Sequence, residues 1–444
     1  MQPGGLFISA RVLLPWGPRV PVLVSPAQNG SEVNELNTTT LFVGIDVSKT
    51  SNTVRFMDGS GDTLSLFDVP NNADGAAALM EKLHRTLLHS DYGKVTVGME
   101  STSVYAEHLA AYLRSDESLR KRGCTVHVIN ARNIRKFKES YPEYPKTDNI
   151  DTLIIADYLR FDRLPKSVCH DEKYLALRNM TRARFQAAQN LSREKTRFLD
   201  TLFQKFSTLD SAKVFSDTFG ATSLAAICDF LSVDEIISTP IAELTDFVNR
   251  KGKGKFADPE AVANALQAAA RSSYRVSRTV CDSLNQLLAV RLVGIRAIEA
   301  QIKTLDKAIG SFMGAFQNVL VSIPGIGPVY SSGIMAEIGD ISRFDGQAAL
   351  AKYAGLAWRR HQSGGFEAAN TKMILSGNKY LKYYMLEAAN KVRMHDAVFA
   401  EYYRVKSRDV PKHQHKRALA LTARKLVRLV YSLLCTNRLY TPLR

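Results

Sequence analysis

At 444 residues, with 45% hydrophobic and 23% charged side chains, the chain has an ordinary folded composition and the length of two or three domains. Lys and Arg number 59 against 43 Asp and Glu, a net charge of +16. No stretch approaches the roughly 20 apolar residues of a membrane-spanning helix. From Met313 to Arg444 alone, 20 basic residues face 8 acidic ones. The charge therefore favours nucleic acid over a membrane as partner.

The cysteines and the N-terminal segment further limit the kinds of site and the extent of the fold that the sequence predicts. The five cysteines form no CxxC pair, so they offer no zinc site and match the reduced thiols of a cytoplasmic protein. Residues 1–38 contain five prolines, and their apolar run is broken by proline and arginine. We expect this segment to be a disordered or mis-annotated extension outside the fold.

The first predicted element is a buried strand within Leu41–Lys49, and it carries one acid, Asp46. Two short strands, a helix, a strand, a helix, a strand and a helix follow at residues 53–57, 63–69, 73–88, 94–99, 104–113, 125–129 and 150–159. This order is that of a RuvC-like (ribonuclease-H-like) α/β domain, which we place at residues 39–165. Since the first and fourth strands are neighbours in that fold, Asp46 and Glu100 should lie side by side.

Four acids in this domain have the pattern of a metal site. Asp148 and Asp151 are three residues apart at a predicted helix start, so they share the helix face aimed at the strand ends. Carboxylates are the oxygen ligands that Mg²⁺ or Mn²⁺ takes, and two such ions stabilise the attacking and leaving oxygens at a phosphorus. Singly, Asp148 or Asp151 is better explained as an acid favoured by the helix dipole. The metal site depends on all four acids together.

The predicted loop 130–147, just before that helix, alternates basic and aromatic side chains beside the acids. Such a loop suits a nucleic-acid backbone, although a solvated loop has the same composition. The candidate contacts are Lys49 after the first strand and Arg132, Arg135, Lys136 and Lys146, with Lys138, Tyr141 and Tyr144 among them.

Residues 166–315 are predicted to be helical. A basic helix at 172–206 comes first, and residues 207–275 are mixed and rich in helix. A heptad pattern follows, with Cys281, Leu288, Ile295, Ile302 and Ile309 at one position and Leu284, Ile298, Leu305 and Phe312 at the other, interrupted by Arg291. The pattern predicts a coiled coil, whose partner is either the 172–206 helix or another subunit.

The last part, residues 316–444, is predicted to be mostly α-helical and to begin with a helix-hairpin-helix. Its hairpin is Ile323–Pro328, followed by a helix at 329–338. Gly325 and Gly327 would let backbone amides approach a phosphate at a helix N-terminus. A plain turn between two helices has the same residues.

A second candidate contact follows in a glycine-flanked loop. Arg359 and Arg360 come just before Ser363, which precedes two glycines. A hydroxyl in such a loop can reach a phosphate, but a loop serine is more often a turn former. From spacing alone, catalysis by Ser363 is the minority interpretation.

Five motifs in this order resemble the DEDD transposases of the insertion-sequence-one-ten family, relatives of the Piv DNA invertase. They are Gly44–Lys49, Met99–Thr102, Lys146–Asp151, Pro324–Pro328 and the run from Tyr353 to Gly365, within a match over residues 40–435. The resemblance implies a RuvC-like DEDD domain, a coiled coil and a C-terminal transposase domain. It also implies that Asp46, Glu100, Asp148 and Asp151 bind the metal and that Ser363 attacks a DNA phosphate to form a covalent serine–phosphate link.

The same resemblance implies the partners. Family members act as homodimers and homotetramers on double-stranded DNA, combine the acids of one subunit with the serine of another, and use a bridge RNA. The 172–206 helix and the basic C-terminal residues Lys412, Lys416 and Arg417 are then nucleic-acid surfaces, in a bacterial cytoplasmic protein associated with the nucleoid. One departure concerns the nucleophile. Leu375 stands where members usually have lysine, and Ser376 after it is a second candidate.

Three other functions fit part of the pattern. A RuvC-like metal-dependent nuclease or junction resolvase would cut with activated water and need no serine. A sugar-kinase-like ATPase also ends its first strand on an Asp, but it requires glycine and a small hydroxyl residue where Val47, Ser48 and Lys49 stand. A nucleic-acid-binding scaffold with a decayed site would not be expected to keep all four acids.

Overall fold

The chain folds into two compact units, Met1–Cys169 and His170–Arg444. The computed structural model describes residues 40–101, 104–141, 147–162, 164, 172–359, 362–363, 366–367, 372–409 and 412–442, with the backbone alone described at 362–363 and 366–367. The predicted extension at residues 1–38 lies outside these ranges.

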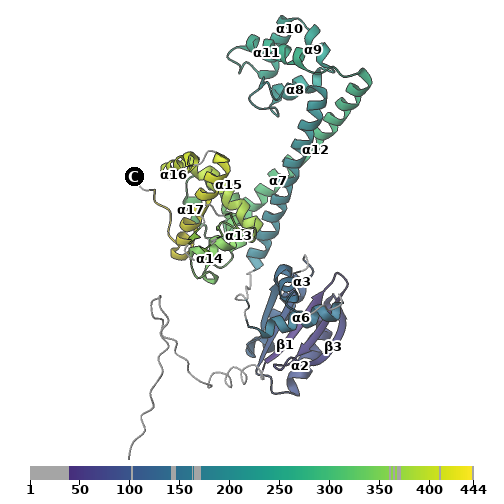
Figure 1. Cartoon of the computed structure of the whole chain (residues 1–444), viewed down its shortest axis with the longest axis vertical. Coiled ribbons are helices and arrows are strands. Elements are labelled where there is room, and N and C mark those ends of the chain that lie inside the picture. The colour runs from purple at the N-terminus through teal and green to yellow at the C-terminus, as the bar shows by residue number, and fades with distance from the viewer. Residues whose placement is uncertain are drawn as a thin grey trace, which may run out of the picture. The chain divides into compact units, whose positions relative to one another are not determined.

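A five-stranded sheet with the order β3-β2-β1-β4-β5 forms the centre of the first unit (Figure 1). The first three strands form an antiparallel meander, whereas β4 and β5 run parallel to β1. This arrangement confirms the prediction that the first strand is central and neighbours the fourth. The strands are β1 (Thr40–Val47), β2 (Ser51–Met57), β3 (Thr63–Pro70), β4 (Lys94–Glu100) and β5 (Thr125–Ile129).

Helices cover both faces of this sheet. Leu41, Val43 and Ile45 of β1 pack in one core with α2 (Ala73–Leu88), α3 (Ala106–Ser115) and α4 (Glu117–Lys121). Phe42 packs in a second core with α5 (Ala131–Lys138) and α6 (Asp148–Arg160). Because successive side chains of a strand point to opposite faces, Asp46 shares the face of Phe42 and α6.

The second unit begins with a pair of long helices, α7 (Glu172–Lys205) and α12 (Arg278–Phe312). They run antiparallel: Arg184, in the N-terminal half of α7, pairs with Asp306 in the C-terminal half of α12. Thr201, near the C-terminus of α7, accepts a hydrogen bond from Arg291 in the N-terminal half of α12. The heptad helix therefore packs against the 172–206 helix of its own chain, one of the two partners predicted for it. Arg291, the interruption in the heptad, also pairs with Glu194 at 3.0 Å, so its charge is satisfied across the helix pair.

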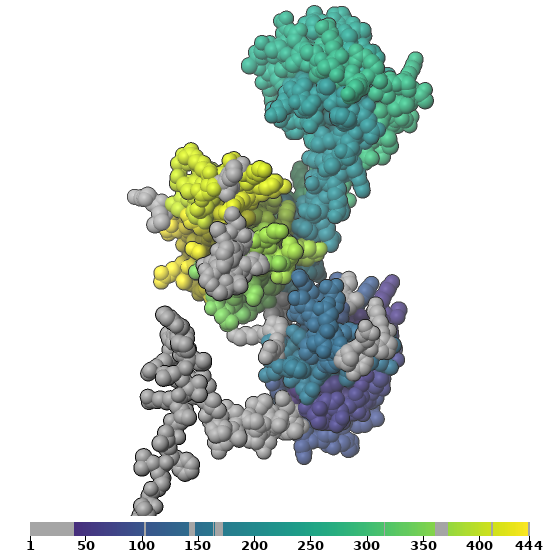
Figure 2. Space-filling model, in the orientation of Figure 1, coloured from purple at the N-terminus to yellow at the C-terminus, as the bar shows by residue number. Residues whose placement is uncertain are grey.

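Two helical groups lie at opposite ends of this pair (Figures 1 and 2). At one end, Phe198, Leu202 and Leu288 pack with the small helices inserted between α7 and α12. At the other end, Leu177 and Ile309 pack with the C-terminal helices. The inserted helices are α8 (Ala221–Asp229), α9 (Val233–Ser238), α10 (Ile241–Gly252) and α11 (Pro259–Ser272), and the C-terminal ones are α13 (Pro328–Ile338), α14 (Gln347–Tyr353), α15 (Lys379–His395), α16 (Ala397–Arg408) and α17 (Gln414–Thr436).

The chain is thus a mixed α/β sheet domain followed by a mostly helical remainder. Within the described ranges, no helix combines the length and apolarity needed to cross a bilayer. The described cysteines, Cys124, Cys228, Cys281 and Cys435, are all free thiols.

Candidate functional site

Two acids lie at the ends of the neighbouring parallel strands β1 and β4. Ile45 pairs with Met99 in the register of these strands, and the next residues along each chain are Asp46 and Glu100. Both side chains are partly buried. The predicted juxtaposition of Asp46 and Glu100 therefore follows from the observed strand register.

Two glycines bring α6 onto this end of the sheet. Gly44 of β1 and Gly98 of β4 stand opposite one another in the register. A Cβ at Gly44 would clash with the backbone of Thr152 and Ala156, and a Cβ at Gly98 would clash with the side chain of Leu159. The helix can lie against the strands only because both positions lack a side chain.

The first turn of α6 carries the other two acids. Thr147 caps the helix through a hydrogen bond to the Ile150 amide, and Asp148 and Asp151 lie in the first turn. Asp148 is exposed, whereas Asp151 is partly buried. The side chain of Arg55, on β2, donates to the Asn149 carbonyl oxygen at 2.9 Å and to the Thr152 hydroxyl at 3.3 Å. Arg55 therefore fixes the start of α6 against the sheet, a role that no sequence motif indicated.

The electrostatics of the four acids show that they interact. Burial, followed by the charges of Asp151, Asp148 and Glu100, raises the pKa of Asp46 to about 6. Burial and the charge of Asp151 also raise the pKa of Glu100, against the opposing effect of Lys138. Asp46 and Glu100 are thus harder to ionise than isolated carboxyl groups, as expected where like charges share a site.

The acids do not, however, form a closed cage. Among the described residues, no three His, Cys, Asp or Glu side chains lie close enough together to hold a metal ion. One reason is visible at Asp151, whose Oδ1 lies 2.5 Å from the Lys138 ammonium. The donor set itself is all carboxylate oxygen, which is the chemistry that Mg²⁺ and Mn²⁺ prefer. The chemistry of the four donors therefore suits such an ion, whereas their described arrangement does not bring three of them close enough to hold one.

The segment predicted as a loop at 130–147 begins instead with helix α5. Asn130 caps this helix, Ile134 is buried beneath it, and Phe137 packs edge-on against Tyr158 of α6. A cavity of about 590 Å³ separates part of α5 from two of the acids, and it is lined by Glu100, Ala131, Arg132, Ile134, Arg135, Lys138 and Asp151. Arg132 and Arg135 therefore face the acids.

The other nucleic-acid candidates of the first unit are dispersed. Lys136 is exposed on α5 and is not among the residues that line the cavity. Lys49 is exposed in the turn between β1 and β2. Lys146 lies outside the described residues.

The glycines of the predicted hairpin differ from one another. Gly325 has a φ of +89°, and a Cβ there would meet the Lys391 carbonyl oxygen of α15 at 2.9 Å. Gly327 is exposed at the N-cap of α13, and a Cβ added there would meet nothing within 4 Å. Only the short 3₁₀ turn Val319–Ser322 precedes the hairpin. Gly325 therefore allows close packing against α15. Gly327 leaves the N-terminus of α13 accessible, as the predicted approach of a phosphate to its backbone amides requires.

Ser363 lies on a β-ladder rather than in an irregular loop. Its backbone belongs to β6 (Gln362–Ser363), which pairs with β7 (Phe366–Glu367). At the base of the segment that carries this ladder, the Arg359 amide donates to the Lys372 carbonyl oxygen and the Ile374 amide donates to the Ala357 carbonyl oxygen. Arg360 and the side chain of Ser363 lie outside the described part. Ser376, the second candidate, is exposed near the base of the ladder.

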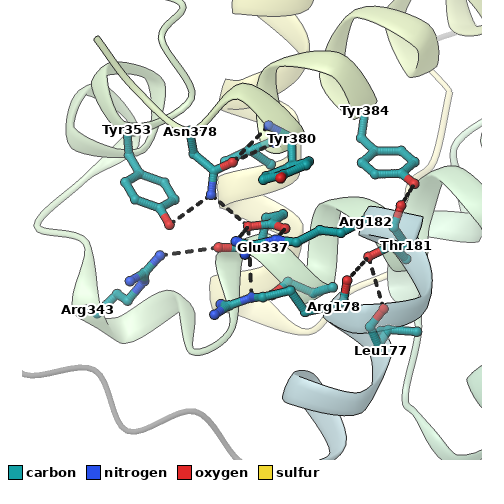
Figure 3. Close-up of polar contacts among 12 residues, drawn as sticks. Leu177, Arg178, Thr181, Arg182, Glu337, Arg343, Tyr353, Asn378, Tyr380 and Tyr384 are labelled. Carbon is teal, nitrogen blue, oxygen red and sulfur yellow. Dashed lines mark hydrogen bonds and ion pairs between the residues drawn. The ribbon is translucent and has the colours of Figure 1, made fainter. Parts of the chain in front are cut away.

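A buried carboxylate that the sequence analysis did not single out lies close to this base (Figure 3). Glu337 of α13 is wholly inaccessible and binds the Arg182 guanidinium through both oxygens, at 2.7 and 3.0 Å. Arg178 lies 3.9 Å away, and Asn378 donates to Glu337 at 2.7 Å and to the Tyr353 hydroxyl at 3.0 Å. The cluster joins α7, α13 and both ends of the segment that carries Ser363.

The basic surfaces proposed for nucleic acid have different outcomes. Lys412, Lys416 and Arg417 are exposed. The cations of the 172–206 helix are largely paired within the chain, because Arg182 binds Glu337, Arg184 binds Asp306 and Lys195 binds Glu299. These paired cations are not free to bind nucleic acid, so they do not support a nucleic-acid surface on that helix. The exposed C-terminal cations remain available for one.

The fold and the site define a basic protein whose α/β unit carries two carboxylates at the ends of its central strands and two in the first turn of α6, beside the cationic helix α5. Two family models match the chain: one described as "Transposase" covers residues 43–207, and one described as "Transposase IS116/IS110/IS902 family" covers residues 317–404. The chain belongs to the IS110 family of transposases, which are DNA-recombining enzymes.

Individual relatives agree with this assignment. The insertion element IS116 uncharacterized 44.8 kDa protein of Streptomyces clavuligerus is 26% identical over 90% of this chain and 96% of its own length. The insertion element IS110 uncharacterized 43.6 kDa protein of Streptomyces coelicolor is 25% identical over 90% and 95%. The pilin gene-inverting protein of Moraxella bovis is 32% identical over 27% of this chain and 37% of its own length.

Proposed function

We propose that this transposase cuts and rejoins double-stranded DNA at the ends of a bacterial insertion sequence through a covalent link between Ser363 and a DNA phosphate. In this proposal residues 39–165 are a RuvC-like DEDD domain, 166–315 a coiled-coil region and 316–444 the transposase domain that carries the serine. A divalent ion, Mg²⁺ or Mn²⁺, is held by Asp46, Glu100, Asp148 and Asp151.

The observation that carries the proposal is the mutual influence of these four acids. They come from β1, β4 and α6, and their burial and charges raise the pKa of Asp46 to about 6. Such clustering costs folding free energy unless a cation compensates it. An ion bound there would neutralise charge at the reacting phosphate and polarise its oxygens.

The chain's own residues supply the remaining parts of the chemistry. The Ser363 Oγ attacks phosphorus and loses its proton, while the deoxyribose oxygen of the broken strand leaves as a hydroxyl. Rejoining reverses the step, because a deoxyribose hydroxyl of the exchanged strand attacks the serine phosphate and releases Ser363. The number of phosphodiester-type bonds is conserved, so no ATP is needed. Arg132 and Arg135 would hold the phosphate backbone near the acids.

The assembly is also part of the proposal. A bridge RNA pairs with donor and target DNA, and a homodimer or homotetramer combines the acids of one subunit with Ser363 of another. The exposed cations Lys412, Lys416 and Arg417 supply backbone contacts. The protein would act in the cytoplasm, at the nucleoid.

Denaturing electrophoresis tests the nucleophile. Purified protein is incubated with the RNA transcribed beside its gene, Mg²⁺ and labelled element-end DNA, and Ser363→Ala is compared with Ser376→Ala. We expect a protease-sensitive, covalently shifted DNA band that only Ser363→Ala loses. A band lost only in Ser376→Ala would transfer the role to that serine.

Two other outcomes are informative. Cut DNA without a covalent band in any variant would replace the serine mechanism with a nuclease that uses activated water. Full exchange by RNA-free protein would remove the bridge RNA from the proposal.

A further inference from the structure

Lys138 occupies the position where the acid cluster meets the cationic helix α5. Its ammonium lies 2.5 Å from Asp151 Oδ1, and the two side chains are 27% and 22% exposed. The pair joins α5 to the first turn of α6. It is the one ion pair to a member of the four-acid set among the described residues.

The pair sits at the wall of a cavity that suits a phosphate. Arg132 and Arg135 line the same cavity of about 590 Å³ as Lys138 and two of the acids. The three cations favour an anion, and a lysine ammonium on its flexible stem can change partner without backbone movement. A DNA phosphate entering the cavity would therefore compete with Asp151 for Lys138.

A metal ion and this lysine also compete. An ammonium that binds Asp151 removes a ligand from the acid set and repels an incoming divalent cation. This agrees with the absence, among the described residues, of three acidic, His or Cys side chains close enough to hold a metal. The metal-binding arrangement therefore requires Lys138 to leave Asp151.

We propose that Lys138 is an exchangeable counter-ion: it holds Asp151 while DNA is absent and transfers to a DNA phosphate when DNA binds, which frees Asp151 for the metal. The inference rests on the proposed metal site and adds that DNA and metal bind cooperatively. Because such coupling is reciprocal, DNA and metal each increase the affinity for the other by the same factor. The device delays assembly of the catalytic centre until a substrate strand is present.

Mn²⁺ binding tests this directly, with free Mn²⁺ counted by electron paramagnetic resonance. The full-length protein is titrated with Mn²⁺ in the absence and in the presence of an element-end duplex. For wild type we expect the duplex to tighten binding about tenfold, within the usual range of coupling between sites. Lys138→Met should bind Mn²⁺ nearly as tightly without the duplex as wild type does with it, and its coupling should fall toward one.

The lysine of another ion pair in the same unit provides the matched control. Lys121→Met removes the same charge from the Lys121–Glu117 pair of α4, at a position outside the cavity lining, so its coupling should equal that of wild type. Equal loss of coupling in both variants would mean a general effect of charge and would overturn the proposal. Weaker Mn²⁺ binding by Lys138→Met alone would also overturn it, because the lysine would then support the metal site.

Asp46→Asn separates this inference from the proposed function. If Asp46→Asn loses Mn²⁺ binding while Lys138→Met behaves as wild type, the metal site stands and the exchange of partners fails. If wild type binds no Mn²⁺ with or without the duplex, both fail. If Mn²⁺ binds and Asp46→Asn binds it equally well, the metal lies elsewhere and the inference falls with the assigned ligands.

Discussion

The wholly buried Glu337 and the four clustered acids of the first unit differ in how the protein compensates their negative charge. Glu337 is wholly buried, yet it binds Arg182 through both oxygens and receives a further hydrogen bond from Asn378. Figure 3 shows these donors converging on one carboxylate from several elements of the second unit. Protein donors therefore compensate the negative charge that burial of Glu337 removes from water.

The acids of the first unit lack such a set of protein donors. Asp46 is influenced by three other carboxylates, and among the described residues Lys138 is the one cation in an ion pair with a member of the group, Asp151. A buried acid with complete protein partners serves the fold, whereas clustered acids without such partners are the candidates for an external cation, as in the proposal above. The comparison predicts that substitutions at the two places should separate stability from activity.

The largest expected effect is on activity at Asp46. Asp46→Asn keeps the size of the side chain but removes a charge from the acid set, so strand exchange should fall at least about 10³-fold, the scale of losing one preorganised electrostatic group. Cleavage and exchange of labelled element ends measure the loss. DNA binding, followed by gel mobility shift, should stay close to wild type. Binding lost together with activity would mean that the acid is structural.

The next effect is on stability at Glu337. Glu337→Ala leaves the partly buried guanidinium of Arg182 without its partner, which should cost about 3 kcal/mol of unfolding free energy, the lower end for breaking a buried pair. Denaturant unfolding of the full chain, followed by circular dichroism, measures it. Glu337→Gln retains an acceptor and the shape, so it should lose less.

A paired variant sharpens that result. Arg182→Met combined with Glu337→Met removes both charges and should recover part of the stability lost in Glu337→Ala. A Glu337→Ala protein that unfolds like wild type but fails to recombine DNA would contradict the structural role. Glu337 would then belong with the acids of the first unit.

The contrast between these sites also explains what the sequence could predict. The order of strands and helices was sufficient to place Asp46 beside Glu100, because strand neighbours in such a sheet follow from the order of elements. Gly44 and Gly98 were a usable signal for the close approach of α6, since glycine inside a strand often marks such contacts. The local pattern carried this information.

What the sequence missed depends on contacts between distant residues. Helix α5 was predicted as a loop because its four basic side chains obscure the apolar period, whereas in the fold Ile134 and Phe137 pack against α6. The pairing of Arg182 with Glu337 joins residues 155 positions apart. The Lys138–Asp151 pair was missed for the same reason, because it appears only when α5 and α6 meet.

The smallest effect concerns pH in metal-free protein. The pKa of Asp46 rises from 3.8 to about 6 on folding, so between these values the folded state retains a proton that the unfolded chain has released. The free energy of unfolding should therefore fall as pH rises through this window. Allowing for solvent screening of a partly exposed group, we expect roughly 1 kcal/mol.

Asp46→Asn has no proton to lose at this position, so it provides the reference. In EDTA its melting temperature should gain about 1 °C on wild type between pH 4 and pH 7.5, the shift expected for about 1 kcal/mol in a chain of 444 residues. Adding Mn²⁺ at pH 7.5 should close the gap by stabilising wild type alone. Melting curves that run parallel across the pH range would show that Asp46 is compensated within the protein, as Glu337 is, and the distinction between the two sites would fail.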